Sequence, residues 1–429
     1  MIISEKAHYK ILNAFLLIVA ISLIFRKPST IIIISFFIYS FLNIKKLQFD
    51  NKLIFSQLAL VSPFLIHVLF LWNNSSVVIG LKDVEKYASL LLFPVFILGN
   101  YKYINVNFLL EKYSIFFSIV LSVLFLRYVY YFPELYQKYQ NGIHQWEMGY
   151  SFANSFETHA PALNMHIAFA ASVAFYFLIQ NFIQKKSLII IGINFISFCL
   201  LYYFILYVNT RLALLNLLLA LFLIICSLFL KSAVSQRAAV TGTSIFIISL
   251  FSIVFFIVKY PYMIEKYSVV TFDNLNKIGK LDEIDNVQAI GCNALVTRIS
   301  IWKSTVELIV KKPILGYGSA DSKKTLTEYY KTTNQQFLFR NKFPVHNQLL
   351  DFFLKFGFVG LLVFFIYLLN ILQTGVSLNN TLIKVFFIMF FISNLVDDFL
   401  LRFDGIVYSG FWISCFLCLR KQKLKQIEI

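Results

Sequence analysis

Long apolar runs recur along the whole sequence of 429 residues, and short polar connections separate them. About twelve of these runs are roughly 16–25 residues long, the length that lets a helix cross ~30 Å of hydrocarbon. Hydrophobic residues make up 59% of the chain and charged residues 14%, which excludes a water-soluble globular class. The sequence therefore predicts an all-α polytopic membrane protein. The predicted spans are 11–25, 29–44, 53–71, 84–99, 114–132, 162–180, 187–207, 212–230, 239–258, 348–372, 381–399 and 407–420.

Lysine and arginine residues mark alternate connections between the predicted spans. The net charge is +17, but the basic residues are scattered between apolar runs, so we expect anionic membrane lipid as a partner and no nucleic acid. The positive-inside rule places these connections and both termini in the cytoplasm. Arg26 and Lys27, on a very short outer turn, are exceptions. The basic connections contain Lys45, Lys46, Lys52, Lys102, Lys112, Lys185, Lys186, Lys231, Arg237 and the terminal segment 420–425.

One connection, residues 259–347, is long and hydrophilic, and the alternation of spans places it on the outer side. Long segments cross the membrane regardless of their charge, so its lysines do not disturb this assignment. The chain then divides into three parts. We expect a bundle of about nine spans in residues 1–258, an outer segment in 259–347, and about three spans in 348–429.

The outer segment is predicted to contain amphipathic helices. Apolar residues at steps of three and four, opposite a polar face, predict a helix over 295–309. Its apolar face contains Leu295, Ile299, Trp302, Val306 and Ile309, and its polar face contains Ser300, Lys303, Glu307 and Lys311. Pro313, Gly316 and Gly318 should end this helix. We expect the next helix to begin at Pro344, which places His346 in its first turn, where free backbone N–H groups favour a neutral imidazole or a nearby anion.

The cysteine and histidine patterns predict neither a disulfide framework nor a metal site. Four of the five cysteines lie in apolar runs, and only Cys292 lies in the outer segment. His159 and His166 are close enough in sequence to share a helical face, but no third ligand follows at a suitable spacing. We therefore expect no metal and no cofactor.

Polar residues that stand out from the apolar background gather on the predicted outer side. They are His159, Arg211, Arg298, His346, Asp397, Asp398, Arg402 and Asp404. Arg211 opens a span, where a charge is costly without an anionic partner. It either binds an anion, extends to the lipid headgroups, or pairs with Asp397 or Asp398. Arg298 could instead contact lipid phosphate at the membrane surface. His346 could instead be an ordinary polar residue at the start of a helix.

Two arginines and a histidine on one outer face would suit transfer from a polyprenyl diphosphate donor. Guanidinium groups can hold the two phosphates and stabilise them as they depart, without a metal. A neutral histidine can take the proton from the attacking sugar hydroxyl.

Several segments carry a family resemblance. The outer segment contains RISIWKSTVELIVKKPILGYGSAD followed by HNQLLDFFLKFGFVGLL, and earlier spans begin with ETHAPALNMHIAFA and NTRLALLNLLLAL. The last polar link and span read DDFLLRFDGIVYSGFWISCFL. Together these segments resemble the bacterial O-antigen ligase and O-antigen polymerase superfamily.

The resemblance implies a GT-C type fold in the bacterial inner membrane, with the active site and one large segment in the periplasm. It implies inverting, metal-independent transfer of a glycan from undecaprenyl diphosphate. Arg211 and Arg298 match the arginines placed on the diphosphate, and His346 matches the catalytic histidine placed on the acceptor hydroxyl. We also predict that His159, Asn347 and Arg402 bind substrate.

Two positions depart from the family pattern. Thr210 stands where a serine usually precedes the arginine of the arginine-led span, and Asp397 or Asp398 stands where glutamate is commoner.

Three functions are compatible with this sequence. The leading prediction is an O-antigen ligase-like glycosyltransferase that moves the glycan to lipid A-core. An O-antigen polymerase would use a second lipid-linked glycan as acceptor. A flippase or transporter of lipid-linked oligosaccharides would also be polytopic and basic, but it should carry charges near mid-membrane on several helices. Here the charges cluster at the outer ends of the spans.

Overall fold

The computed structural model describes residues 4–49, 51–230, 236–267, 272–285, 287–290 and 295–427. Over these residues the chain is all-helical, as the hydropathy pattern predicts, and contains no strand. The first half contains α1 (Glu5–Ser22), α2 (Arg26–Leu42), α3 (Ile54–Leu69), α4 (Val77–Tyr87), α5 (Ser89–Gly99), α6 (Val106–Tyr131), α7 (Pro133–Gln140), α8 (Met148–Asn154), α9 (Ala160–Ile183), α10 (Leu188–Val208) and α11 (Arg211–Phe229). The second half contains α12 (Gln236–Lys259), α13 (Pro261–Tyr267), α15 (Val287–Ile290), α16 (Leu295–Lys311), α17 (Ser322–Thr332), α18 (Gln336–Asn341), α19 (Gln348–Ser377), α20 (Thr381–Val396) and α21 (Phe403–Ile427).

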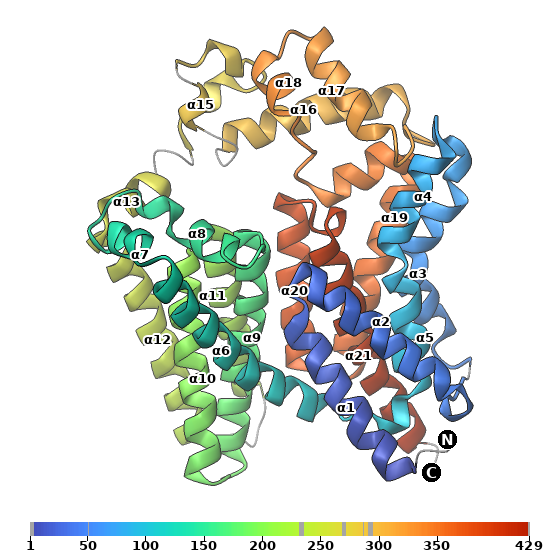
Figure 1. Ribbon diagram of the computed structural model, residues 1–429, viewed down its shortest axis with the longest axis vertical. Helices are drawn as coiled ribbons and strands as arrows, with labels where there is room; N and C mark the ends of the chain where they lie inside the picture. The colour runs from blue at the N-terminus through green and yellow to red at the C-terminus, as the bar shows by residue number, and fades with distance from the viewer. Residues whose placement is uncertain are drawn as a thin grey trace.

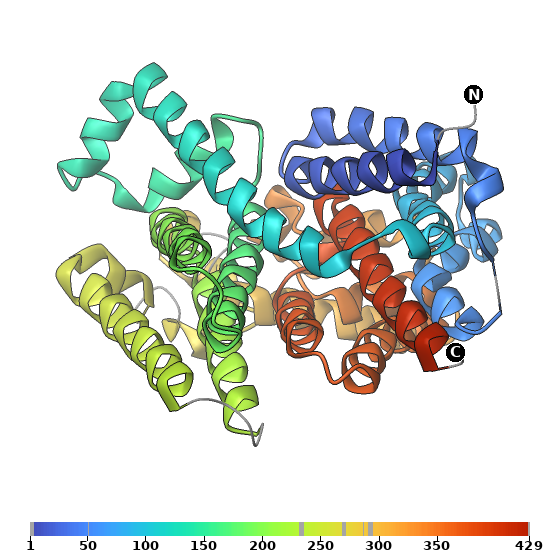
Figure 2. The same cartoon turned by 90° about the horizontal axis from the view of Figure 1, so that it is seen from below.

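The helices form two groups beneath a cap, which contains α15 to α18 (Figure 1). The first group joins opposite ends of the chain, because α3 and α5 pack against α19 and α21. The second group contains α9 to α12, and α6 runs from the first group to the second (Figure 2). Helix α9 packs against α10, α11 and α20, which makes it the central helix of the molecule. Helices α15 to α18 lie at the end opposite both termini (Figure 1).

Seven of the described helices are long and apolar enough to cross a membrane: α6, α9, α10, α11, α12, α19 and α21. Helices α3 and α20 are apolar but shorter. Every span predicted from the sequence overlaps one of the described helices. The chain is therefore a multi-pass membrane protein, while the predicted total of about twelve spans stays a prediction.

Residues 84–99, predicted as one span, are divided in the structure. Helix α4 ends at Tyr87 and α5 begins at Ser89, so this part of the prediction is wrong. The 11 residues of α5 extend about 17 Å at 1.5 Å per residue, too short to cross the hydrocarbon unaided. The sequence concealed the break because α5 continues the apolar pattern without a glycine or proline at the joint.

Helix α19 is interrupted at Gly357, whose φ of 62° and ψ of −152° are not helical. This conformation is essentially restricted to glycine. At the interruption, α19 exchanges backbone hydrogen bonds with the loop that follows α16. Tyr317 N donates to Leu354 O (2.9 Å), Gly318 N to Lys355 O (2.8 Å), and Phe358 N to Pro313 O (2.8 Å). The glycines and proline predicted to end α16 therefore also join the cap to the bundle.

Helix α16 contains the whole predicted range 295–309 and continues to Lys311, but the residues that it buries do not follow the predicted apolar and polar faces. Val306 is 45% exposed, whereas Ser300, a member of the predicted polar face, is fully buried. The helix packs against α17 and α19, so its inner face is defined by the separate core of the cap. Ser300 is accommodated there because it accepts a hydrogen bond from Gly279 N (2.9 Å) and donates to Val296 O (2.7 Å).

Candidate active site

Most of the polar residues singled out in the sequence meet where several helices begin or end, beneath the cap. Arg211 begins α11, His159 precedes α9, and Arg298 lies in the first turn of α16. His346 and Asn347 precede α19, and the residues after α20 contribute Asp397, Asp398 and Arg402.

His346 lies two residues before the first residue of α19. The helix begins at Gln348 with Asn347 as its N-cap, so the prediction of a helix starting at Pro344 with His346 in its first turn is wrong. The Asn347 side chain accepts a hydrogen bond from Leu350 N (3.0 Å), as N-cap residues do, and His346 has a φ of 52°, which a right-handed helix does not allow. The turn before the cap aims His346 toward the end of α20.

Two carboxylates face the His346 ring. Its Nδ1 lies 3.3 Å from Asp397 Oδ1 and 3.7 Å from Asp398 Oδ1. The side chains of His346 and Asp397 are 15% and 20% exposed, and that of Asp398 is fully buried. Both carboxylate oxygens of Asp398 lack a hydrogen-bond partner among the residues that the structure describes. A buried, unbonded carboxylate is costly in its ionised form.

The two aspartates differ in their protonation. Burial acts to raise the pKa of Asp397, but the hydrogen bond from His346 and the Arg402 charge outweigh burial and hold this pKa below its usual range. Burial and the charge of Asp397 raise the pKa of Asp398. The pair thus keeps Asp397 ionised next to His346, while Asp398 retains a proton more readily.

Arg298 is held against the end of α20. Its Nη1 donates a hydrogen bond to Val396 O, the carbonyl that precedes Asp397. Its Nε is buried and has no hydrogen-bond partner in the described part of the chain. One helical turn further on, Trp302 Nε1 donates to His346 O (3.4 Å). Helix α16 therefore fixes both Arg298 and the backbone of His346, while one guanidinium donor of Arg298 remains without a partner among the described residues.

Arg211 is the first residue of α11, as predicted. Thr210 precedes it as N-cap and accepts a hydrogen bond from Asn164 Nδ2 (2.8 Å), which ties the start of α11 to α9. The positive charges of Arg211 and Arg298 are close enough to repel each other. Two cations held within range of one another are favoured when an anion lies between them.

Arg402 and His159 form a second contact on the same side. Arg402 Nη1 lies 2.6 Å from His159 Nδ1. Because a guanidinium only donates, Nδ1 accepts this bond and the ring is neutral with its proton on Nε2. Burial, and then the Arg402 charge, lower the pKa of His159 to about 4, although Asp397 acts in the opposite direction. His159 and His346 also influence each other, so this pair belongs to the same site.

Both polar atoms of the Asn347 amide make hydrogen bonds within the protein. Besides capping α19 through its oxygen, it donates from Nδ2 to Leu395 O (2.9 Å). Asn347 thus joins the start of α19 to the end of α20. This contact positions His346 relative to Asp397.

His346, Asp397 and Asp398 form the group that could hold a metal ion among the described residues, because one ligand atom of each lies within 4.8 Å of the others. The hydrogen bond between His346 and Asp397 accounts for their arrangement without an ion. The expectation of metal-independent chemistry remains a prediction.

Sequence reasoning missed the pairing of His346 with Asp397. The two aspartates were considered as partners for Arg211, whereas the structure places them against His346. The signal available was the acidic pair at the end of an apolar span, a costly position that requires a polar neighbour. Asp351, the carboxylate nearest His346 in the next helix, is engaged by Lys355 (2.6 Å) and Gln348 (3.1 Å) instead.

The fold and the site define a class: an all-helical, multi-pass membrane protein with arginine, histidine and aspartate residues converging at one end of its bundle. Residues 195–365 match the family model described as Wzy_C, O-Antigen ligase. This match supports the O-antigen ligase superfamily predicted from the motifs. The matched segment includes Arg211, Arg298 and His346. No curated protein matches the chain.

Members of the matched family are membrane glycosyltransferase-like enzymes of the ligase or polymerase type. The match supports, in general terms, a function of that type for this chain.

Proposed function

We propose that this protein is an O-antigen ligase-like glycosyltransferase of the bacterial inner membrane, which moves a glycan from undecaprenyl diphosphate to a hydroxyl of lipid A-core. The observation that carries the proposal is the hydrogen-bonded pair of His346 and Asp397 beside Arg298, whose Nε is buried without a partner. A base and a free guanidinium donor at one place are what glycosyl transfer from a diphosphate requires.

The acceptor hydroxyl oxygen attacks the anomeric carbon of the first sugar of the donor. A new carbon–oxygen bond forms, and the bond from that carbon to the diphosphate breaks. The bonding electrons leave with undecaprenyl diphosphate, and attack from the opposite face inverts the anomeric configuration. The proton of the hydroxyl passes to Nε2 of His346, and no oxidant, reductant or metal is required.

Asp397 is the residue that prepares His346 for this step. Its carboxylate accepts the Nδ1 proton of His346, so the lone pair on Nε2 is left to act as base. The same negative charge stabilises the imidazolium that forms when the acceptor proton arrives. Asp398, which retains a proton more readily, adds less negative charge to the site.

Arg211 and Arg298 hold the leaving group. Their mutual repulsion is relieved when the diphosphate lies between them, and the unpartnered Nε of Arg298 gains a charge-assisted hydrogen bond. His159 and Arg402, whose contact borders Asp397, complete the substrate-binding residues.

We further propose a GT-C type arrangement in which the site and residues 259–347 face the periplasm and both termini face the cytoplasm. Residues 1–258 and 348–429 would then be the membrane domains. The position of the cap at the end opposite the termini supports this orientation (Figure 1).

Analysis of surface polysaccharide in a deletion strain tests the acceptor. Loss of the ligase should strand a full-length glycan on the undecaprenyl carrier, with bare lipid A-core on the surface. Lipid A-core capped by single repeat units would instead indicate a polymerase.

A cell-free assay separates catalysis from transport. The purified protein in detergent, with lipid-linked glycan and lipid A-core, should transfer glycan in the presence of EDTA. Detergent solution has no two compartments, so a flippase would give no product. Loss of transfer in EDTA that is restored by a divalent cation would show that the group around His346 binds a metal.

A further inference from the structure

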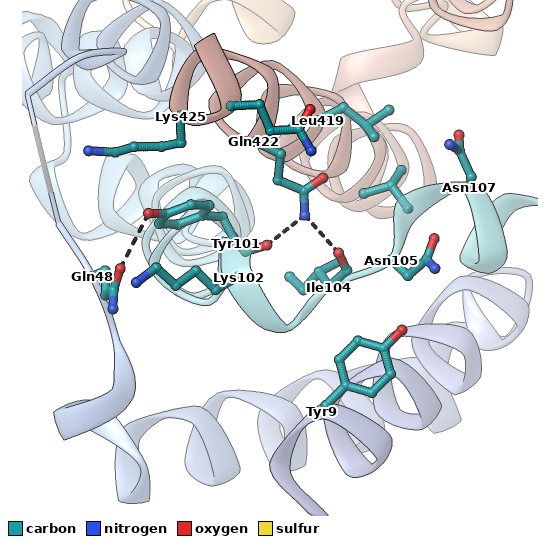
Figure 3. A pocket seen from close by; sticks show the side chains of 12 residues that line it. Tyr9, Gln48, Tyr101, Lys102, Ile104, Asn105, Asn107, Leu419, Gln422 and Lys425 are labelled. Atoms are coloured by element: carbon teal, nitrogen blue, oxygen red, sulfur yellow. Dashed lines mark hydrogen bonds between the residues drawn. The ribbon is translucent and has the colours of Figure 1, made fainter. Parts of the chain in front are cut away.

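A pocket with a volume of about 740 Å³ lies at the end of the bundle that carries both termini, away from the candidate active site. It is bordered by α1, the segment after α2, the short helix η3 (Tyr101–Tyr103), the start of α6 and the end of α21 (Figure 3). The volume is in the range of pockets that bind small ligands. The lining residues are Tyr9, Gln48, Tyr101, Lys102, Ile104, Asn105, Val106, Asn107, Leu419, Gln422, Lys425 and Gln426.

The frame of this pocket is fastened by hydrogen bonds between distant parts of the chain. Gln422 Nε2 donates to Tyr101 O (2.6 Å) and to Ile104 O (2.8 Å), which joins α21 to η3. Tyr101 OH donates to Gln48 Oε1 (3.3 Å). Behind these residues Lys421, only 1% exposed, donates to Gln48 O (3.1 Å) with its Nζ 4.5 Å from the Tyr101 ring centroid. The pocket is thus a preformed feature of the fold.

Among the residues that the structure describes, the lining of the pocket carries positive charge and no negative charge. Two lysines, five amide side chains and two tyrosines contribute, and none of these described lining residues is an aspartate or glutamate. Figure 3 shows Lys102 and Lys425 on either side of Tyr101, with both ammonium ends toward the side of the pocket where Gln48 lies. The buried ammonium of Lys421 adds to the positive potential. Ammonium, amide and hydroxyl groups together are suited to the oxygens of a phosphate ester.

Exposed apolar side chains lie next to lining residues of the pocket in the sequence. Phe49 and Phe108, close in sequence to lining residues, are 65% and 44% exposed, as expected for side chains that face lipid. Basic pockets between helices at the cytoplasmic side of a membrane bind anionic lipid headgroups. Polar groups in the pocket and apolar groups beside it match the headgroup and the acyl chains of one lipid molecule.

We propose that this pocket binds the headgroup of an anionic phospholipid, with the phosphodiester between Lys102 and Lys425. The lipid joins α1, α6 and α21 at the end of the bundle opposite the candidate active site. This inference rests on the proposed orientation, which places the pocket at the cytoplasmic face, but it does not depend on the proposed glycosyl transfer.

Native mass spectrometry of the purified full-length protein with defined lipids tests the proposal. Dioleoylphosphatidylglycerol should bind more tightly than dioleoylphosphatidylcholine. The Lys102→Gln/Lys425→Gln variant should bind phosphatidylglycerol about thirtyfold more weakly, since each basic residue near an anionic lipid contributes about fivefold. The matched control Lys185→Gln/Lys186→Gln removes two exposed charges at the same end of the bundle and should bind like the wild type.

Four results would overturn the proposal. Equal binding of the two lipids would show that the headgroup charge is not recognised. Equal losses of phosphatidylglycerol binding in the two glutamine double variants would show only a general attraction between basic residues and anionic lipid. Displacement of phosphatidylglycerol by an equal concentration of inorganic phosphate would assign the pocket to a free anion. The Lys102→Arg/Lys425→Arg variant should retain binding of phosphatidylglycerol. A folded variant that no longer binds this lipid would also overturn the proposal.

Discussion

At the scale of the residue, the chemistry of the site depends on pairs of side chains. His346 gains its direction and its tautomer from Asp397, His159 is held neutral by burial and by Arg402, and Arg298 keeps Nε unpartnered beside them. These residues act on different properties and so lead to different predictions. His346 and Asp397 act on proton transfer, His159 on stability toward acid, and Arg298 on leaving-group binding.

The His346 and Asp397 pair predicts a loss of transfer without a loss of donor binding. His346→Gln and Asp397→Asn should each lower the rate of glycan transfer by about 10²–10⁴, the usual contribution of a positioned general base. The control Asp83→Asn removes an aspartate that pairs with Lys86 on α4 (2.7 Å) and should transfer normally. A His346→Gln variant with nearly full activity would exclude the base role.

The two arginines predict a strong distinction between guanidinium and ammonium. Arg211→Lys and Arg298→Lys should each lower transfer about ten- to a hundredfold, since a lost charge-assisted hydrogen bond costs ~1.5–3 kcal/mol. Transfer by the purified variants, with their folding checked by thermal unfolding, gives the measurement. Arg127→Lys, whose arginine donates to Ser155 O (3.1 Å), is the control. If both site variants transfer at the wild-type rate, the arginines are interfacial only.

His159 predicts how stability changes with acid. Its pKa of about 4 in the folded protein lies below the ordinary value of 6.5, first because of burial and then because of Arg402. Between these values the unfolded chain binds more protons, so stability falls as pH falls from 6.5 toward 4. His159→Gln removes this contribution, so its melting temperature should fall less than that of the wild type over this interval. His144→Gln, at an exposed histidine, should follow the wild type. Parallel curves for all three proteins would contradict the assignment.

At the scale of the element, the interrupted helix α19 connects the cap to the bundle. Its three backbone hydrogen bonds hold the loop after α16, and the segment before α4 holds the same loop from the other side. Asn73 Nδ2 donates to Leu315 O (2.9 Å), and Ala320 N donates to Asn74 Oδ1 (2.8 Å). These hydrogen bonds, which together form the joint between cap and bundle, hold α16, which carries Arg298, in a fixed position relative to α19, which follows His346.

Gly357→Ala should weaken this joint. A Cβ at position 357 would meet Ile314 O at 2.1 Å, and φ is +62° there, so neither space nor conformation is available. Strain of this kind costs ~1–3 kcal/mol, which should appear as a lower melting temperature together with slower transfer. Gly192→Ala in α10 is the matched control, because nothing lies within 4 Å of its Cβ position and alanine favours a helix. Equal melting temperatures for the two variants would show that the joint is not rigid.

At the scale of the whole molecule, the cap and the chain termini lie at opposite ends of the bundle (Figure 1). The candidate active site lies at the first end, and the pocket proposed to bind lipid lies at the second. The proposed orientation therefore places glycosyl transfer at the periplasmic face of the membrane and lipid binding at the cytoplasmic face.

Cysteine labelling tests this orientation. Lys280 and Lys186 are both exposed, but the first belongs to the cap segment and the second to the turn between α9 and α10. An impermeant thiol reagent should label Lys280→Cys in intact spheroplasts and Lys186→Cys only after permeabilisation. The reverse pattern would invert the topology. Cys292, another candidate for labelling, lies outside the described residues.

The sequence by itself determined the helical class, the positions of most apolar helices and the gathering of polar residues at one end, because hydropathy and charge act through each segment's own composition. Arg211 at a helix start and Arg298 on α16 were predictable for this reason. The tertiary structure alone decided that His346 meets Asp397, 51 residues away, that Ser300 is buried while Val306 is exposed, and that α19 is interrupted at Gly357. Each of these outcomes depends on what a distant segment brings into contact, and local periodicity carries no information about that segment.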